Sequence, residues 1–284
     1  MSTVVLCPNP YKDKLLAVTL EVKAMLESEG FSVRISPEVL DGQEENLPPG
    51  VACTELTQAA AQATLVVSLG GDGTIMHTAR RLIGHPIPII GVNLGTVGFL
   101  AELDRSEIGK LVDAARGNVT LSPRMMLRVE VEREGAVVYE NYALNDVYLH
   151  GIVQMIHITA CGDGHKIVEF SGDGVVIASP TGSTAYSMSA GGPLVEPSAE
   201  NIILTPICAF ALSAPSFVLA PDRVVTVTLG RLRGRAMLSV DGGSFDVRGG
   251  DVLRVRKAEH TTYIAHVGEK TFYDIVYEKL GGRV

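Results

Sequence analysis

The sequence predicts an α/β domain with a parallel, Rossmann-like sheet, followed by a β-rich domain. Over the first 120 residues, apolar strand-like runs alternate with helical segments, as is typical of parallel sheets with crossover helices. From about residue 121, apolar residues recur with a period of two and turns separate the runs, which indicates antiparallel strands. With 284 residues, 46% of them hydrophobic, the chain can build two domains, each with its own core.

The first part is expected to contain four strands and three helices. The expected strands are residues 4–6, 32–35, 65–69 and 87–92. The expected helices are residues 12–29, 75–83 and 107–116, and the first and last of them end at Gly30 and Gly117. Residues 38–49 are acidic, contain proline and have no period, so a loop is expected there.

The second part is expected to be a series of strands closed by a helix at residues 270–280. The expected strands are residues 125–132, 136–142, 155–161, 165–170, 216–219, 224–229, 236–240, 252–256 and 263–267. Gly162-Asp163-Gly164 is expected to form a hairpin turn. Residues 201–221 carry no charge but contain three prolines, which favours buried strands and a loop over a membrane-spanning helix.

Charge and cysteine content exclude several classes of protein. The net charge of −8 argues against a nucleic-acid partner, so any phosphate ligand should be small and accompanied by a metal ion. The four cysteines contain no C-x-x-C pair, which is typical of reduced thiols in the cytoplasm. No signal peptide is expected, because the apolar run at the N-terminus is short and is stopped by proline. We therefore expect a cytoplasmic protein.

The most informative motif follows the expected strand at 65–69 and reads Gly70-Gly71-Asp72-Gly73-Thr74. Glycines after a strand let the backbone approach a phosphate, and the helix that follows favours anions at its start. Asp72 would repel phosphate unless a divalent cation bridges the two or the carboxylate acts as a base toward a hydroxyl. The P-loop and the dinucleotide fingerprint do not fit, because the lysine and the third glycine are missing. The alternative is an ordinary turn with Thr74 as N-cap.

Two further segments carry polar groups suited to a nucleotide. Residues 172–193 are rich in glycine and small hydroxylated residues, which can bind ribose or phosphate, and Tyr186 could stack on a base. A tight packing loop is the alternative there, and a serine hydrolase is disfavoured because G-x-S-x-G is absent. Asn145-Asp146 could read the edge of a purine, although such a pair alone is more often an Asx turn.

The order of these motifs along nearly the whole chain resembles the NAD kinase family. The motifs are Gly-Gly-Asp-Gly-Thr at 70–74, Asn-Leu-Gly-x-x-Gly-Phe-Leu at 93–100, Asn145-Asp146, Asp173-Gly174, Thr-Gly-Ser-Thr-Ala-Tyr-Ser at 181–187 and Asp241-Gly242. The first is shared with diacylglycerol kinases, sphingosine kinases and phosphofructokinases, whereas the segment 184–187 makes the match specific. The resemblance implies phosphorylation of the adenosine ribose 2′-hydroxyl of NAD to give NADP.

The resemblance also implies the cofactors, the domains and the assembly. ATP or polyphosphate would be the phosphoryl donor, with a divalent cation, Mg²⁺, as cofactor. The fold would be the two-domain kinase of the NAD kinase and diacylglycerol kinase type. Residues 1–120 would form the α/β domain, 121–267 the β-rich NAD-binding domain, and 268–284 would pack back on the first. The partners would be NAD and other nucleotides, not nucleic acid or a membrane, and the chain would form a homodimer or homotetramer.

Carried over by position, the family's catalytic acid falls on Asp72, which would orient or deprotonate the 2′-hydroxyl. The implied substrate-binding residues are Asp72, Gly73, His77, Phe99, Asn145, Asp146, Asp173, Thr184, Ala185, Tyr186, Ser187 and Ser189. Phe99 would flank the adenine. His77 has a surface histidine as its alternative. The resemblance assigns no residue as a metal ligand.

The sequence departs from the family's pattern in three places. Ser171 stands where many members have Arg, Gly243 where many have Gln, and residues 209–215 replace the usual Pro-His…Ser-x-Arg-Pro stretch. Two alternative functions therefore stay open. One is a lipid or sugar kinase that shares only the glycine motif, although a lipid acceptor would not require residues 184–189. The other is a non-catalytic dinucleotide sensor.

Overall fold

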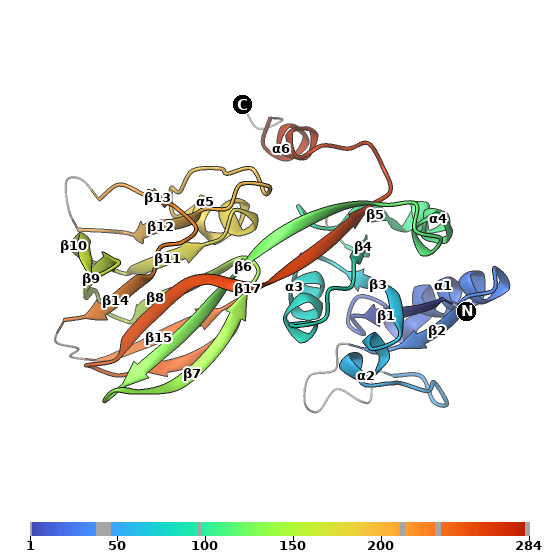
Figure 1. Cartoon of the computed structure of the whole chain (residues 1–284), viewed down its shortest axis with the longest axis horizontal. Coiled ribbons are helices and arrows are strands. Elements are labelled where there is room, and N and C mark those ends of the chain that lie inside the picture. Colours follow the sequence, from blue (N-terminus) through green and yellow to red (C-terminus); the bar gives the residue numbers. More distant parts are fainter. Residues whose placement is uncertain (1, 38–46, 96–97, 211–213, 231–233, 282–284) are drawn as a thin grey trace. The chain divides into compact units, whose positions relative to one another are not determined.

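The computed structural model describes residues 2–37, 47–95, 98–210, 214–230 and 234–281. They form two compact units, of which the first takes its residues from Met1–Pro123 and Thr262–Val284 and the second from Arg124–Thr261 (Figure 1). The first unit is α/β and the second is β-rich, which confirms the predicted fold class. Most of the loop expected at 38–49 lies outside the described residues, as does part of the departure at 209–215.

The first unit is built on a parallel sheet. Four strands pair in the order β2-β1-β3-β4, and β4 also pairs with β5 and with the end of β17. These strands are β1 (Thr3–Pro8), β2 (Ser32–Ile35), β3 (Ala63–Gly70), β4 (Ile89–Asn93), β5 (Leu103–Asp104) and β17 (Val252–His266). Because all these pairs are parallel, the loops that follow β1, β3 and β4 leave the sheet at the same edge.

The helices of the first unit bury apolar side chains against its sheet, except the last, which has no buried residue. They are α1 (Ala17–Ser28), α2 (Leu56–Ala60), α3 (Asp72–Arg81), α4 (Leu111–Ala115) and α6 (Phe272–Leu280), with 3₁₀ turns at Lys14–Leu16 and Arg105–Lys110. Asp13 fixes the start of α1, because its carboxylate accepts the N–H groups of Val18 at 2.9 Å and Thr19 at 2.8 Å. The helix therefore begins later than the expected residue 12.

Helix α3 begins at Asp72, three residues before the helix expected at 75–83. Gly71 precedes it with extended backbone and acts as the N-cap, so the alternative with Thr74 as the cap is wrong. The Thr74 hydroxyl instead accepts a hydrogen bond at 3.3 Å from the amide of Asn9, which lies after β1. An acid in the first turn is favourable, because the N-terminal end of a helix is positive.

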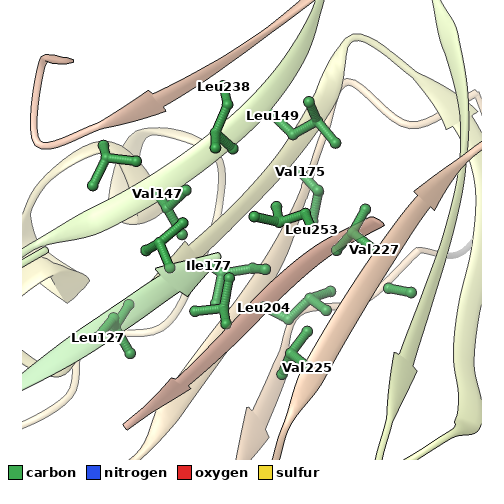
Figure 2. Packing of buried hydrophobic residues seen from close by; sticks show 14 of the residues in the cluster. Leu127, Val147, Leu149, Val175, Ile177, Leu204, Val225, Val227, Leu238 and Leu253 are labelled. Carbon is green, nitrogen blue, oxygen red and sulfur yellow. The ribbon is translucent and has the colours of Figure 1, made fainter. Parts of the chain in front are cut away.

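The second unit consists of antiparallel strands in two sheets. One has the order β10-β9-β14-β17, with β6 paired to β17 and to β7, and the other has the order β13-β12-β11-β8-β15-β16. The strands are β6 (Thr120–Arg133), β7 (Ala136–Ala143), β8 (Asp146–Ile152), β9 (Ile156–Gly162), β10 (His165–Gly172), β11 (Gly174–Ala178), β12 (Ile202–Ile207), β13 (Phe217–Leu219), β14 (Val225–Leu229), β15 (Arg235–Val240) and β16 (Gly243–Val247). Side chains from both sheets share one apolar core, which includes Val147, Ile177 and Val227 (Figure 2).

Turn chemistry connects these strands as predicted. Asp163-Gly164 joins β9 to β10 with φ values of 49° and 82°. A two-residue hairpin turn of type I′ requires positive φ at both of these positions. Asp241-Gly242 joins β15 to β16 in the same way, with φ values of 43° and 84°. The uncharged stretch at 201–221 contributes β12, which is fully buried, and β13. No helix within the described ranges has the length and apolar character needed to cross a membrane.

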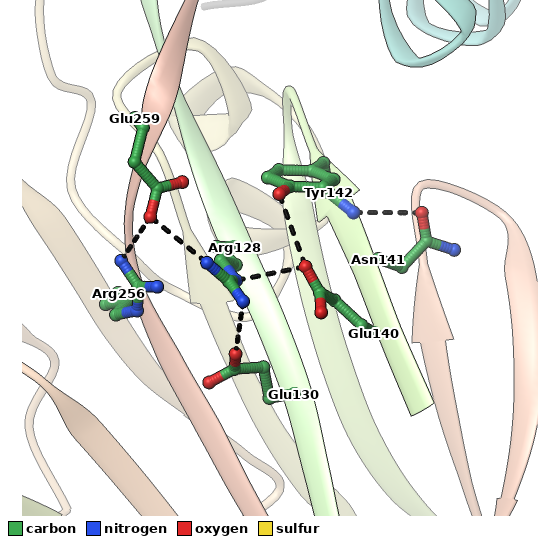
Figure 3. A network of polar contacts seen from close by, with 7 residues as sticks. All are labelled: Arg128, Glu130, Glu140, Asn141, Tyr142, Arg256 and Glu259. Atoms are coloured by element: carbon green, nitrogen blue, oxygen red, sulfur yellow. Dashed lines mark hydrogen bonds and ion pairs between the residues drawn. The ribbon is translucent and has the colours of Figure 1, made fainter. Parts of the chain in front are cut away.

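Polar contacts connect neighbouring strands of the second unit. Arg128 on β6 forms ion pairs with Glu130, Glu140 and Glu259, and thereby links β6 to β7 and β17 (Figure 3). Arg133 at the end of β6 makes a two-pronged contact with Asp251, with N···O distances of 2.8 and 2.7 Å. Only 1% of the Asp251 side chain is exposed, so this pair is far less screened by water than the others.

We predict that Asp251→Ala lowers the free energy of unfolding by about 2–4 kcal/mol, because it leaves the Arg133 guanidinium without its carboxylate. Asp246→Ala is the matched control, since it removes the ion pair with Arg235, in which both side chains are more than half exposed. Its cost should stay below about 0.5 kcal/mol. Urea denaturation of the two variants measures both values, and equal losses would contradict the prediction.

Candidate functional site

In the first unit, backbone N–H groups hold the carboxylate of Asp72. Oδ2 accepts the N–H of Phe99 at 2.7 Å, and Oδ1 accepts those of Leu100 at 3.1 Å and Ala101 at 3.3 Å. A Cβ on Gly98 would lie 1.8 Å from Oδ1, so only glycine allows this approach. Among the described residues, Oδ2 accepts a single hydrogen bond, and a carboxylate oxygen can accept two. Oδ2 therefore keeps the capacity to accept a proton from a substrate hydroxyl.

The glycines of the turn serve different purposes. A Cβ on Gly70 would lie 2.3 Å from Thr74 Oγ1, so this glycine is required for close packing between β3 and α3. Gly73 is exposed, and a Cβ there would meet no atom within 4 Å. The turn at Gly73 is thus open to a ligand.

Phe99 and His77 lie near this turn in the chain but in different surroundings. Lys279 on α6 places its ammonium 5.4 Å from the centre of the partly buried Phe99 ring. His77 is half-buried on α3. Burial, together with the charges of Arg81 and Arg80, lowers the pKa of His77, so its imidazole is neutral at pH 7.

In the second unit, Asp241 organises the Asn145-Asp146 pair. Its carboxylate accepts the backbone N–H groups of Leu144 at 2.6 Å and of Asn145 and Asp146 at 3.1 Å each. In return, the N–H of Asp241 donates to the carbonyl of Asp146 at 3.1 Å. The β15–β16 hairpin turn therefore fixes the start of β8. Both Asn145 and Asp146 are less than one-tenth exposed.

The hydroxyl-rich segment packs directly on this pair. Ser179 donates its backbone N–H to the carbonyl of Asn145 at 2.8 Å. A Cβ on Gly182 would lie 2.1 Å from the same oxygen, so the contact requires glycine. The backbone N–H of Tyr186 also bonds to the carboxyl of Asp146. The structure thus brings together three segments that the sequence analysis singled out separately.

The side chains of the hydroxyl-rich segment divide into internal and accessible groups. Ser187, on the short helix α5 (Tyr186–Ser189), is fully buried and shares a hydrogen bond of 3.2 Å with the hydroxyl of Thr205. Thr184 donates to the carbonyl of Thr181 at 3.2 Å. Ser189 and Tyr186 are exposed, and Ala185 is half-buried. The segment therefore packs tightly through some hydroxyls while it leaves others accessible.

A pocket of about 890 Å³ lies beside this segment, within the second unit. Its lining includes Tyr148, His150, Asp173, Tyr186, Ile207 and Cys208. The rings of Tyr148 and Tyr186 meet edge to face at 4.9 Å. A hydrogen bond to the exposed Asp173, together with its charge, raises the pKa of the Cys208 thiol, which therefore stays protonated at pH 7.

The sequence analysis named Asp173 and Tyr186 but missed Tyr148 and His150. A signal for them was present, because alternate residues of a strand point to the same face. If Asp146 at the start of β8 is assigned to the face that binds a ligand, then Tyr148 and His150, two and four residues later, are expected on the same face. Asp241 and Gly98 stand in the motifs that the sequence analysis quoted, but their contacts could not be predicted, because these contacts join segments that lie far apart in the chain.

The departures from the family's pattern also have defined places. The Ser171 hydroxyl lies 3.2 Å from Nδ1 of His157, whose Nε2 lies 3.0 Å from Glu169. Gly243 begins β16, opposite Val240. Within the part of the chain that the structure describes, no three His, Cys, Asp or Glu side chains cluster as a metal site.

Comparison with known proteins covers both units. Residues 4–116 match the model of the ATP-NAD kinase N-terminal domain, and residues 144–267 match that of the ATP-NAD kinase C-terminal domain. NAD kinase of Ruminiclostridium cellulolyticum is 33% identical over 277 residues, covering 96% of this chain and 95% of that protein. NAD kinase of Heliobacterium modesticaldum is 40% identical over 231 residues, covering 80% of this chain and 81% of that protein.

Solved structures show the same fold. Yeast NADH kinase complexed with NADH superposes with a TM-score of 0.86 at 25% identity, covering 100% of this chain and 88% of that one. An NAD kinase from Archaeoglobus fulgidus in complex with ATP gives a TM-score of 0.75 at 23% identity, with both chains fully covered. This second likeness shows the fold alone.

The family models and the aligned relatives decide between the functions that the sequence analysis left open. A lipid or sugar kinase would share only the glycine motif, whereas here the second half of the chain also matches the ATP-NAD kinase model. Relatives aligned over nearly the whole chain are NAD kinases, which also argues against a non-catalytic sensor. The chain therefore belongs to the NAD kinase family and is a phosphotransferase.

Proposed function

We propose that this protein transfers a phosphoryl group from ATP to the adenosine ribose 2′-hydroxyl of NAD, giving NADP and ADP. The observation that carries the proposal is the Asp72 carboxylate, which three backbone N–H groups fix beside the open glycine turn while Oδ2 accepts only one hydrogen bond from the described residues. The aligned NAD kinases and the yeast NADH kinase complex support the choice of substrate.

In this reaction Asp72 accepts the proton of the 2′-hydroxyl. The hydroxyl oxygen then forms a bond to the γ-phosphorus of ATP, the bond from that phosphorus to the β,γ-bridging oxygen breaks, and ADP leaves. The glycine turn places its N–H groups beside the phosphates, and α3 contributes the positive end of its dipole. Mg²⁺, held by the donor's phosphate oxygens, would supply further neutralisation of charge. Positioning and charge stabilisation account for most of the catalysis.

The residues of the second unit bind the dinucleotide in this proposal. Asn145 and Asp146 contact the adenosine, and Tyr186 offers a ring face for stacking. The remaining binding residues, as the family resemblance implies, are Gly73, His77, Phe99, Asp173, Thr184, Ala185, Ser187 and Ser189. Ser187 contributes through the position of its helix, because its hydroxyl bonds to Thr205.

A coupled assay tests the proposed function directly. Purified protein is incubated with NAD, Mg²⁺ and either ATP or polyphosphate, and NADP is detected with an NADP-specific dehydrogenase. We expect NADP with ATP, and the polyphosphate arm identifies whether a second donor is used. Repeated absence of NADP with both donors would refute the proposal, and heat of NAD binding without ADP release would favour a sensor.

We predict that Asp72→Asn lowers kcat by about 10²–10⁴-fold, because the amide cannot accept the proton of the hydroxyl. The Asn side-chain oxygen can still accept the N–H groups of Leu100 and Ala101, which preserves two of the three bonds, while its NH₂ replaces the acceptor of the Phe99 N–H. Circular dichroism and NAD titration check that the variant is folded and binds substrate. Asp113→Asn, in the first turn of α4, is the control and should retain activity. A folded Asp72→Asn variant with near-normal kcat would remove Asp72 from the chemistry.

Asp146 lowers the free energy of unfolding by an amount that depends on pH. Burial raises the pKa of Asp146 to about 7, the charge of Asp241 adds to this rise, and the N–H of Tyr186 opposes it. The ordinary value is 3.8, so the folded protein keeps a proton that the unfolded chain has lost. The free energy of unfolding therefore falls as the pH rises from about 4 to about 7. Such a cost is typical of a carboxyl retained for its function.

We predict that Asp146→Asn raises the free energy of unfolding, and that the gain is larger at pH 8 than at pH 5 by about 1–3 kcal/mol. The amide keeps the bond from the Tyr186 N–H but removes the buried charge. Urea denaturation of wild type and variant at both pH values measures the difference. An equal effect at the two pH values would show that Asp146 does not titrate with a raised pKa.

We also propose that the chain forms a homodimer or homotetramer. The second unit exposes large apolar side chains, including Val153 at 100%, Phe210 at 82% and Met155 at 57%. Exposed apolar groups of this size are typical of surfaces that a partner covers. We expect sedimentation velocity to show an oligomer, and a strict monomer with full activity would contradict the assembly.

A further inference from the structure

The structure places a lysine that no motif includes beside the glycine turn. Lys12 lies in the loop after β1, and a Cβ on Gly71 would lie 2.5 Å from its Nζ. A Cβ on Gly95, in the loop after β4, would lie 3.5 Å from the same atom. The absence of side chains at these two glycines thus leaves room for the Lys12 side chain between two loops.

Backbone contacts fix the position of this lysine. The N–H of Asn9 donates to the carbonyl of Leu69 at 2.9 Å, which ties the loop after β1 to the end of β3. The N–H of Leu94 donates to the carbonyl of Gly70 at 2.8 Å, which ties the loop after β4 to the same end. The Lys12 N–H itself donates to Asn9 at 3.0 Å. Three loops therefore meet at the carboxyl edge of the parallel sheet, where ligands of open α/β sheets bind.

The charges around Lys12 favour an anion. Its ammonium lies beside Gly71, the N-cap of α3, where the helix dipole is also positive, and the nearby Asp72 carboxylate bonds to the N–H groups of residues 99–101. The carboxylate of Asp13 does not neutralise this ammonium, because its oxygens bond to Val18 and Thr19. The lysine ion pairs found within the described residues all involve other lysines.

A pocket of about 360 Å³ opens at the same place. It is lined by Lys12 in the loop after β1, by Asn93 at the end of β4 and Gly95 after it, and by Arg105 and Ser106 in the 3₁₀ turn after β5. Lys12 and Arg105 give the lining two cationic side chains, against the single carboxylate of Asp104. The Asn93 side chain holds Gly95 through bonds of 3.1 and 3.2 Å, which fixes one wall.

We infer that Lys12 and this pocket bind the phosphate chain of the phosphoryl donor. The inference rests on the proposed function and adds to it a residue for the donor. Lys12 neutralises phosphate oxygens at the glycine turn, while Asp72 serves the hydroxyl of the acceptor. The ligand chemistry is a chain of phosphate groups, whether it belongs to ATP or to inorganic polyphosphate.

Equilibrium binding tests the inference without any turnover. Calorimetry with Mg²⁺ and either ATP or inorganic triphosphate, in the absence of NAD, compares wild type with Lys12→Ala, Lys12→Arg and Lys14→Ala. We expect Lys12→Ala to weaken both ligands about 10- to 100-fold, because a charge-assisted contact is lost. Lys12→Arg should keep most of the affinity. Lys14→Ala, an exposed lysine two residues away, should bind as wild type does.

Kinetics separates failure of this inference from failure of the proposed function. In active protein, Lys12→Ala should raise the KM for ATP about 10-fold or more while the KM for NAD stays within about twofold. Triphosphate binding that is unchanged in Lys12→Ala would overturn the inference, even if NADP is formed. Triphosphate binding that is lost in Lys12→Ala would support it, even if the assay with NAD shows no product.

Discussion

The carboxylate of Asp72 is the group on which the arrangement of the first unit's site depends. Its bonds to three consecutive N–H groups join the start of α3 to the loop after β4. Hydrogen bonds to an ionised acceptor are about twice as strong as neutral ones, and here they fix a loop that has no regular structure of its own. The proposed base therefore also holds the loop after β4 in place, and these bonds limit the positions that its carboxylate can adopt.

Asp241 repeats this arrangement in the second unit. It too accepts three consecutive N–H groups, and it is placed by a hairpin turn whose φ values are positive. Asp13 holds the start of α1 by the same means. In each case a single carboxylate accepts backbone N–H groups of an irregular segment or of the first turn of a helix, which would otherwise lack a partner when buried. Rigid loops are therefore obtained without additional secondary structure.

Much of the fold could be predicted because periodicity reports which residues are buried. The parallel strands of the first unit and most antiparallel strands of the second follow from it, as does the turn at Asp163-Gly164, whereas β8, β11 and β16 were not among the expected strands. Helix α2 could not be predicted, because its five residues are too few to show a helical period. The start of α3 was also misplaced, because the extended Gly71 rather than a hydroxylated residue caps it.

The candidate site was predictable where its residues form motifs and not where single residues meet across the fold. Asp72 and Asn145-Asp146 stand out as polar groups in apolar surroundings. Lys12 is separated from the glycine turn by about 60 residues, and only strand order brings the two together. The composition of the hydroxyl-rich segment suits both ligand binding and internal packing, so the sequence could not predict which role each hydroxyl has. The hydroxyl of Ser187 serves internal packing.

Successive side chains of β8 alternate between the apolar core and the opposite face of the strand, so the register of the strand decides which residues reach each face. Val147 and Leu149 enter the apolar core (Figure 2). Asp146, Tyr148 and His150 alternate with them and belong to the opposite face of the strand. A single inserted or deleted residue would exchange the two sets, sending an acid and an imidazole into the core and two aliphatic side chains to the pocket. Core packing therefore protects the chemistry of the pocket, since any length change that would scramble the pocket is also excluded by folding.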